Sequence, residues 1–293
     1  MRSLLCLVTL CFAPSFLAAQ TPEEVKATIK FVQARQQADG GFTVSAAEKE
    51  GQTSLRATSG AIRALKYFGG EVPDREKAAK FVAACFDTKT GGYSDKPQGK
   101  PEIILTAVGI MAAVELKMPD AFIAKAVDYL AANTNPKEFE EMRIAAAGFD
   151  SAKKFPMEVT QRWLAEVVAK KNNDGSYLTP TGDARMTGSA VALILRLGGT
   201  LTDAERKASL AILKGGQRTD GGFGKADGGS DLETTYRVIR AFHMLKEKPG
   251  DVAKLTVYIG KCRNPDGGYG VEPGKPSTIA ATYYASILLH WQK

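Results

Sequence analysis

Two kinds of apolar pattern alternate along the chain. Residues 25–32 carry apolar side chains in one stripe on a charged background, whereas residues 103–114 are apolar nearly all round. A helix of the first kind exposes one face to water, but a helix of the second kind must be enclosed by other elements. The alternation therefore predicts an outer layer of striped helices and an inner layer of apolar helices.

A short glycine–aromatic motif separates the two kinds of helix. It occurs at residues 39–42, 90–93, 174–177, 220–223 and 266–269. The copies are 46 to 51 residues apart, except that the step from Gly91 to Gly175 covers 84 residues and therefore two periods. The missing copy is expected near residues 133–136. Repetition at a fixed period indicates a repeat architecture, here of six units within residues 24–293.

The end units decide whether the repeat is open or closed. Both are full copies without a polar cap, which an open solenoid needs at its ends. We therefore predict an all-α fold, an α/α toroid in which six helix pairs form a ring closed by contact between the first and last units. The expected domain is residues 21–293, with units at about 24–70, 71–118, 119–154, 155–199, 200–249 and 250–293.

The motif itself is expected to be structural. Glycine adopts positive φ at little cost and often ends a helix, and a second glycine lets the chain turn sharply. The aromatic residue that follows is expected to pack between neighbouring units. None of the copies matches the pattern of a phosphate-binding P-loop.

The N-terminus has the layout of a secretory signal peptide. Residues 1–20 contain one early Arg2, an apolar run and small residues at positions 18 and 19. This pattern predicts export to a periplasmic or extracellular location, with cleavage after Ala19 or, alternatively, retention as an anchor. No other segment could span a bilayer.

The charge distribution limits the expected partners, and the positions of the cysteines indicate whether a disulfide can form. The net charge is +7, but the basic residues are scattered among acids, so we expect no nucleic-acid partner and only a mild preference for anions. Cys85 and Cys262 occupy equivalent places in units that are not neighbours in a ring of six. They are therefore expected to be two buried free thiols.

The repeated motif, together with residues 273–284 (PGKPSTIAATYY), resembles the β subunits of protein prenyltransferases and, more distantly, squalene and terpene cyclases. The resemblance implies a central funnel for an isoprenoid or other lipid, basic residues for its diphosphate, and zinc held by Asp, Cys and His. Arg143, Arg185 and Lys225 fall where that family places its cations. The alternative is that they are surface cations paired, respectively, with the acids Glu141, Asp183 and Asp227.

The zinc site departs from the family pattern. Asp231 matches the aspartate, but Glu233 stands at the cysteine position and Ala281 at the histidine position. Without thiolate and imidazole, no zinc cofactor and no metal site of this type is expected. Asp231 and Glu233 could instead contact a ligand or a harder cation, or cap the helix that they begin.

The remaining candidates concern the cavity. Tyr236, Tyr283 and Tyr284 either line a lipid cavity or belong to the core. The Asp-x-Asp-Asp acid motif of the cyclases is absent from the chain. The leading hypothesis is a toroid that binds an apolar or anionic ligand, or a peptide, in its centre. A prenyltransferase and a non-catalytic scaffold remain alternatives, so the sequence leaves enzymatic activity open.

Overall fold

The computed structural model describes residues 20–47, 52–179 and 183–292. The signal peptide predicted at residues 1–20 lies almost wholly outside this part of the chain. Within it the chain forms twelve helices. They are α1 (Pro22–Gln33), α2 (Leu55–Phe68), α3 (Arg75–Ala84), α4 (Ile103–Leu116), α5 (Asp120–Asn133), α6 (Phe139–Ala152), α7 (Met157–Val168), α8 (Ala184–Arg196), α9 (Asp203–Gly215), α10 (Leu232–Met244), α11 (Val252–Lys261) and α12 (Ile279–Trp291).

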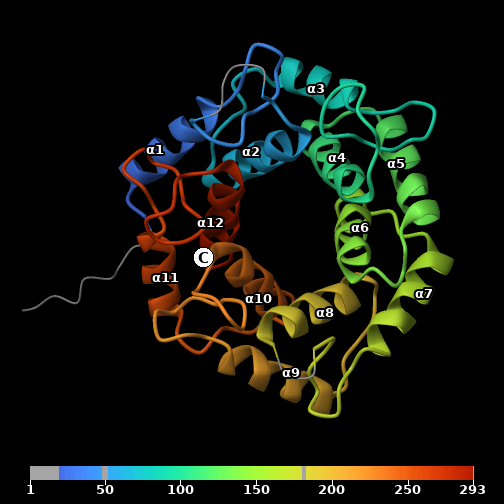
Figure 1. Ribbon diagram of the computed structural model, residues 1–293, viewed down its shortest axis with the longest axis vertical. Helices are drawn as coiled ribbons and strands as arrows, with labels where there is room; N and C mark the ends of the chain where they lie inside the picture. The colour runs from blue at the N-terminus through green and yellow to red at the C-terminus, as the bar shows by residue number, and fades with distance from the viewer. Residues whose placement is uncertain (1–19, 48–51, 180–182, 293) are drawn as a thin grey trace, which may run out of the picture.

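The helices form two concentric layers (Figure 1). The odd-numbered helices lie outside and the even-numbered helices inside, each outer helix leading to the inner helix of the same pair. Each inner helix packs against the next, and α12 packs against α2. The apolar helices predicted for the inner layer are the ones enclosed, so the predicted closed toroid of six helix pairs is confirmed.

Hydrogen bonds join the first and last units where the ring closes. The Thr28 hydroxyl in α1 donates to the carbonyl of Gly267 at 2.7 Å. The N–H of Ile279, the first residue of α12, donates to the carbonyl of Val44 at 2.8 Å. Closure therefore uses backbone as well as side-chain contacts, and it leaves neither end of the repeat bare.

The glycines of the motif are required for a reason that the sequence did not predict. Helix α1 ends at Gln33 with a right-handed cap, so Gly40 does not end the helix as expected. Gly40 lies farther on, in a turn with φ +88°. A Cβ there would be 2.2 Å from the carbonyl oxygen of Lys77 in α3. The glycine is needed because the next outer helix approaches the turn so closely.

The same contact recurs at the closure of the ring. A Cβ on Gly267, in the last copy of the motif, would be 2.6 Å from the carbonyl oxygen of Ala27 in α1. The last copy of the motif therefore packs against α1 in the same way as the first copy packs against α3. The contact between the last and first units is thus of the same kind as the contacts between successive units, as a closed ring requires.

The aromatic residue of each motif is buried, and the Tyr93 hydroxyl donates to the carbonyl of Phe122 in the next unit at 3.4 Å, which confirms the predicted packing between units for that copy. All five are at most 1% exposed: Phe42, Tyr93, Tyr177, Phe223 and Tyr269. The backbone N–H of each donates, over 2.9 to 3.3 Å, to a threonine hydroxyl at the fourth residue of the following inner helix: Thr58, Thr106, Thr187, Thr235 and Thr282. In the unit without the motif, Met142 holds this position and only residues 134–138 join α5 to α6.

Two further expectations concern the whole chain. Cys85 and Cys262 are buried and free, as predicted, and burial raises the pKa of each thiol to about 12. None of the helices in the described ranges is long and apolar enough to cross a membrane.

Candidate ligand site at the centre of the ring

Arginines from four inner helices converge on the centre of the ring. On α8 a lumen-facing stripe runs through Arg185, Ser189, Ala192 and Arg196, at the three- and four-residue spacing that keeps side chains on one face. The small residues in the middle of this stripe leave room for side chains from the other helices. The other central arginines are Arg63 of α2, Arg143 of α6, and Arg237 and Arg240 of α10.

A network of ion pairs fills the side of the ring where α6, α8 and α10 begin. Arg237 donates to Glu140 at 2.7 Å and, through a second nitrogen, to Glu233 at 2.7 Å. Arg143 donates to the other oxygen of Glu140 at 2.9 Å. Arg185 completes the chain with a 3.3 Å contact to Glu233. Two carboxylates are thus shared among three guanidinium groups.

The network controls the ionisation of its carboxylates. Burial opposes ionisation of Glu140, but the hydrogen bond from Arg237 and the charge of Arg143 hold its pKa at about 2. The pKa of Glu233 is also lowered, because Arg237 and Arg185 outweigh its burial. Both side chains are therefore anionic at neutral pH and serve as counterions.

The other half of the centre, nearer the C-terminal ends of the inner helices, has fewer carboxylates than arginines. Arg196 is 3.5 Å from Asp150, and this carboxylate also binds Lys153 at 2.7 Å. Arg240 is 7% exposed and contacts no carboxylate among the described residues. Burial, followed by the charge of Arg196, holds the pKa of Arg240 well below that of a free arginine.

Aromatic rings surround Arg240 in place of a carboxylate. Its guanidinium carbon lies 4.3 Å from the ring centre of Tyr236 and 5.5 Å from that of Trp291. Such cation–π contacts stabilise a buried cation but do not neutralise it. The Nε atoms of Arg185, Arg196 and Arg240 are buried and have no hydrogen-bond partner. The centre therefore contains donors that no described residue uses.

The cavity that these arginines share is small. The cavity has a volume of about 10 Å³, and its lining consists of Arg143, Ser189, Ala192, Arg196, Tyr236, Arg237 and Arg240. That is room for about one water molecule. In this conformation the centre is filled by charged and aromatic side chains and is not the open apolar funnel that the resemblance implied.

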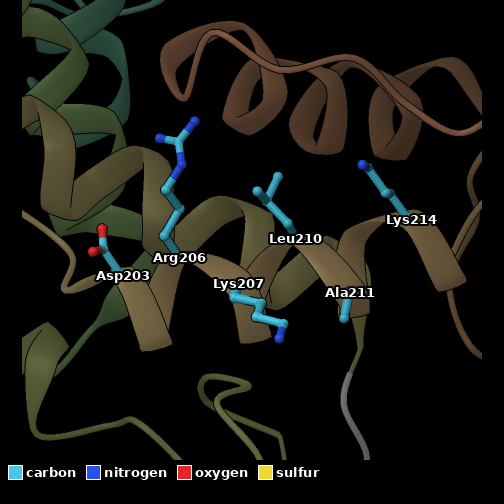
Figure 2. Close-up of a pocket in the computed structure, with 6 residues that line it drawn as sticks. All are labelled: Asp203, Arg206, Lys207, Leu210, Ala211 and Lys214. Carbon is cyan, nitrogen blue, oxygen red and sulfur yellow. The ribbon is translucent and has the colours of Figure 1, made fainter.

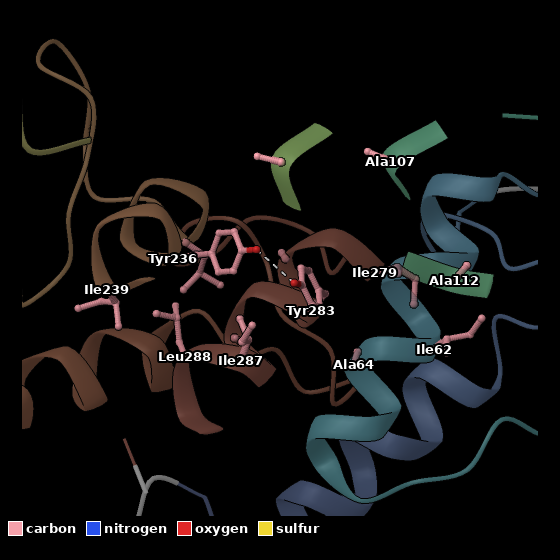
Figure 3. Close-up of a cluster of buried hydrophobic side chains, with 14 of the residues drawn as sticks. Ile62, Ala64, Ala107, Ala112, Tyr236, Ile239, Ile279, Tyr283, Ile287 and Leu288 are labelled. Carbon is pink, nitrogen blue, oxygen red and sulfur yellow. Dashed lines mark hydrogen bonds between the residues drawn. The ribbon is translucent and has the colours of Figure 1, made fainter. Parts of the chain in front are cut away.

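The three tyrosines predicted to line a cavity do lie together. The Tyr236 and Tyr283 hydroxyls are 3.2 Å apart and share a hydrogen bond, which Figure 3 shows among the apolar side chains of the inner layer. The Tyr284 ring is 5.0 Å from that of Tyr236, and burial raises the pKa of Tyr284 to about 12. Arg63 lies over the ring of Tyr283 at 4.4 Å. The cluster therefore belongs both to the core and to the wall of the centre.

The predicted cations are only partly brought together. Arg143 and Arg185 both reach the network, and they pair there with Glu140 and Glu233 instead of with Glu141 and Asp183, which the alternative named. Glu141 accepts a hydrogen bond from the N–H of Asn135, and Asp183 caps α8. Lys225 is exposed in the loop before α10, with no contact between its side chain and the central arginines among the described residues.

Asp231 and Glu233 have separate roles. Asp231 caps α10 by accepting from the N–H of Thr234 at 2.7 Å, whereas Glu233 points into the arginine network. Ala281, at the family's histidine position, is buried in α12. No cluster of three His, Cys, Asp or Glu side chains suited to hold a metal occurs in the part of the chain that the structure describes.

Four central arginines and their main counterion were not identified from the sequence. They are Arg63, Arg196, Arg237, Arg240 and Glu140. A usable signal was present in α10, where Glu233, Arg237 and Arg240 recur at four- and three-residue spacing within a helix that is otherwise largely buried. Charge on the enclosed face of an inner helix is costly, so it indicates a partner or a ligand.

A second hollow lies on the outer face of the ring, along α9 (Figure 2). Its volume is about 340 Å³ and its lining residues are Asp203, Arg206, Lys207, Leu210, Ala211 and Lys214. Arg206 is already paired with Glu247 at 2.8 Å. The hollow is an open surface groove that contains none of the predicted site residues.

The fold and its centre can be compared with known proteins. Protein geranylgeranyltransferase-I of Candida albicans, solved in complex with GGPP, superimposes with a TM-score of 0.64 at 14% identity, over 90% of each chain. The type II terpene cyclase MstE of Scytonema, solved with geranylgeranyl dihydroxybenzoate, gives a TM-score of 0.63 at 10% identity, over 92% of this chain and 95% of that one. A protein from Actinoplanes gives 0.61 at 13% identity, over 92% and 98%.

At these identities the likeness concerns the fold alone. None of the curated proteins matches the chain by sequence. The sequence profile of the prenyltransferase alpha-alpha toroid domain does match, over residues 1–69, 58–132 and 122–291. These segments span almost the entire chain, and the twelve helices form the ring that the name of the domain describes. The chain belongs to the prenyltransferase alpha-alpha toroid domain family.

Proposed function

We propose that the protein binds an anionic ligand at the centre of its ring. The observation that carries this proposal is the charge there: six arginines converge, and among the described residues the carboxylates that contact them are Glu140, Asp150 and Glu233. Burying a guanidinium without a counterion is costly, and an incoming anion removes that cost. Guanidinium groups also match carboxylate and phosphate oxygens in geometry.

The test is calorimetric titration of the purified protein with inorganic phosphate, pyrophosphate, sulfate and acetate in a chloride buffer. We expect at least one of these anions to bind at one site per chain. Simultaneous replacement of Arg143 and Arg240 by Met is expected to abolish binding, whereas Arg162→Met, on the exposed face of α7, should leave it unchanged. Absence of binding by every anion would contradict the proposal.

A second candidate is transfer of an isoprenoid group. It is favoured by the fold, since the transferase from Candida albicans and the cyclase from Scytonema were both solved with geranylgeranyl compounds. Against it stands the filled centre, which would have to open before a long chain could enter. Incubation with a labelled prenyl diphosphate and a cysteine peptide tests for transfer. Extraction with organic solvent tests for bound lipid, and a scaffold role would leave both assays blank.

We also propose that no zinc is needed. Glu233, at the family's cysteine position, is engaged by Arg185 and Arg237, and Ala281 offers no ligand atom in place of imidazole. Metal analysis of the purified protein should therefore find zinc far below one per chain. Stoichiometric zinc would contradict this part of the proposal.

Export completes the proposed function, because the pattern of residues 1–20 is that of a signal peptide. Fractionation of the source cells, followed by N-terminal sequencing, tests it. We expect the protein outside the cytoplasm with Gln20 as its first residue, or, if the segment is retained as an anchor, with the intact N-terminus in the membrane fraction. Recovery of the intact chain from the cytoplasm would contradict export.

A further inference from the structure

We propose that the anion binds between Arg196 of α8 and Arg240 of α10, and that it is a dianionic oxyanion of the phosphate or sulfate class. This inference rests on the proposed function and assigns it a location and a ligand charge. The location is the part of the central cavity nearer the C-terminal ends of the inner helices. Arg143 and Arg237 of the ion-pair network line the same cavity nearer the helix starts, whereas Arg185 does not line it.

Arg240 supplies the strongest reason for this location. Its side chain is buried, and its Nε has no hydrogen-bond partner among the described residues. Most buried arginines contact a carboxylate, whereas the guanidinium of Arg240 contacts aromatic rings. Buried charges in folded proteins are ordinarily paired, so an unpaired one needs an explanation. An anion held in the cavity that Arg240 lines would supply the missing partner.

Arg196 lies beside the same cavity and is also incompletely paired. Its side chain is 9% exposed, its Nε is 3.5 Å from Asp150, and the geometry of that contact does not form a hydrogen bond. Asp150 forms a shorter pair with Lys153, at 2.7 Å, so its charge is already shared. Arg196 therefore keeps donors available on the side that faces Arg240.

The charge balance selects a dianion. Arg196, Arg240 and the nearby Arg63 are three cations, and the one carboxylate among the described residues that contacts any of them is Asp150, which Lys153 also neutralises. A local charge of at least +2 is left. A monoanion such as acetate would balance half of it, whereas phosphate or sulfate would balance it fully. Their oxygens also match the paired N–H groups of two guanidinium groups.

The tyrosine pair adds neutral donors. In the Tyr236–Tyr283 hydrogen bond one hydroxyl donates and the other accepts, so the accepting hydroxyl still has a proton to donate. Tyr236 lines the cavity, so one hydroxyl of this pair belongs to a residue that borders the proposed site. This arrangement favours an acceptor-rich ligand, as an oxyanion is.

Side-chain movement must accompany binding, because the cavity now holds about one water molecule. Arg240 is held against Tyr236 and Trp291 by cation–π contacts, which are weaker than charge-assisted hydrogen bonds to an oxyanion. An anion would therefore draw Arg240 away from Trp291. Because the other tryptophan, Trp163, lies in outer helix α7, Trp163→Phe leaves Trp291 as the sole tryptophan reporter.

The experiment is a fluorescence titration of the Trp163→Phe protein with inorganic phosphate, sulfate and acetate, repeated by calorimetry on the unchanged protein. We expect phosphate and sulfate to bind and to change the emission of Trp291, and acetate to bind at least tenfold more weakly. Arg240→Met should weaken phosphate binding about 10- to 100-fold, as expected for loss of a charge-assisted hydrogen bond. Arg240→Lys should lie between Arg240→Met and the unchanged protein, and Arg162→Met should match the latter.

The outcomes separate the two proposals. If phosphate binds but is lost in Arg185→Met and kept in Arg240→Met, the anion lies in the network at the helix starts; the location is then wrong and the proposed function stands. Acetate binding as tightly as phosphate would contradict the proposal that the ligand is a dianion. If no anion binds at all, the proposed function fails. Parallel titrations with glycerol 3-phosphate and short-chain phosphatidic acid distinguish free phosphate from a phosphate on an organic or lipid ligand.

Discussion

Arg237 on α10 and Glu140 on α6 form a 2.7 Å ion pair across the centre of the ring, although α8 lies between these two helices in ring order. The packing of the inner helices joins neighbours around the ring. This pair instead joins the third and fifth helix pairs directly, and Arg143 and Glu233 extend it on either side. The centre is therefore part of what holds the ring together, as well as the place where a ligand is proposed to bind.

Glu140→Gln is expected to destabilise the protein. The change removes the negative charge that pairs with both Arg143 and Arg237. The Glu140 side chain is 46% exposed, so solvent screens part of the loss, and we expect a decrease of about 1–3 kcal/mol in the free energy of unfolding. Urea denaturation measures it, with Glu158→Gln on the outer helix α7 as control. A decrease no larger than that of the control would show that the network does not stabilise the ring.

The same carboxylate predicts a pH dependence. The pKa of Glu140 is about 2 in the folded protein and about 4.3 in an unfolded chain, so the folded state binds fewer protons. Its contribution to stability is complete above about pH 4.3 and is lost as the pH falls toward 2. We expect the unfolding free energy to fall in this window, and to fall less steeply in Glu140→Gln. Equal slopes in the two proteins would contradict the assignment.

The ring could be predicted from the sequence because its determinants are local and repeated. A helix as apolar as residues 103–116 has to be enclosed, and five glycine–aromatic turns set the period. The reason for the glycines was not accessible, because the carbonyl of Lys77 that requires Gly40 belongs to the next unit. Contacts between units depend on how the ring closes, which no single unit encodes.

The centre was harder to predict for a related reason. Arg196 ends α8 and Arg240 lies within α10, and each alone is typical of an ordinary helical arginine. Whether such a side chain faces the lumen depends on the rotation of six helices relative to one another. The family resemblance indicated Lys225 as a ligand-binding cation, but Lys225 lies on an exposed loop. The buried arginines that it did not indicate carry most of the charge.

Gly40→Ala tests why glycine occupies this position of the turn. Two costs are expected, one from positive φ and one from the 2.2 Å approach to the carbonyl of Lys77. Gly69 is a matched control, since it has φ +77° but no atom within 4 Å of the place that a Cβ would take. We expect Gly69→Ala to cost about 1 kcal/mol and Gly40→Ala at least about 2 kcal/mol more. Equal losses in thermal unfolding would mean that packing against α3 is not the reason.

Arg240→Met is expected to stabilise the protein in a buffer free of phosphate and sulfate. The guanidinium is buried without a carboxylate, and methionine fills similar space without a charge, so desolvation cost is removed. The lost contacts with Tyr236 and Trp291 offset part of this gain. A net increase of about 1 kcal/mol in unfolding free energy is expected, and Arg162→Met should stay within about 0.5 kcal/mol of the unchanged protein.

Phosphate should reverse the order of stability. A ligand that binds only the folded state stabilises it in proportion to the logarithm of its concentration above Kd, so the unchanged protein gains more stability than the variant, which binds phosphate more weakly. Thermal unfolding at increasing phosphate concentration should therefore show the two melting curves crossing. A variant less stable than the unchanged protein without any anion would mean that the rings alone satisfy Arg240. In that case its burial would be explained by packing, and no ligand would be needed to account for it.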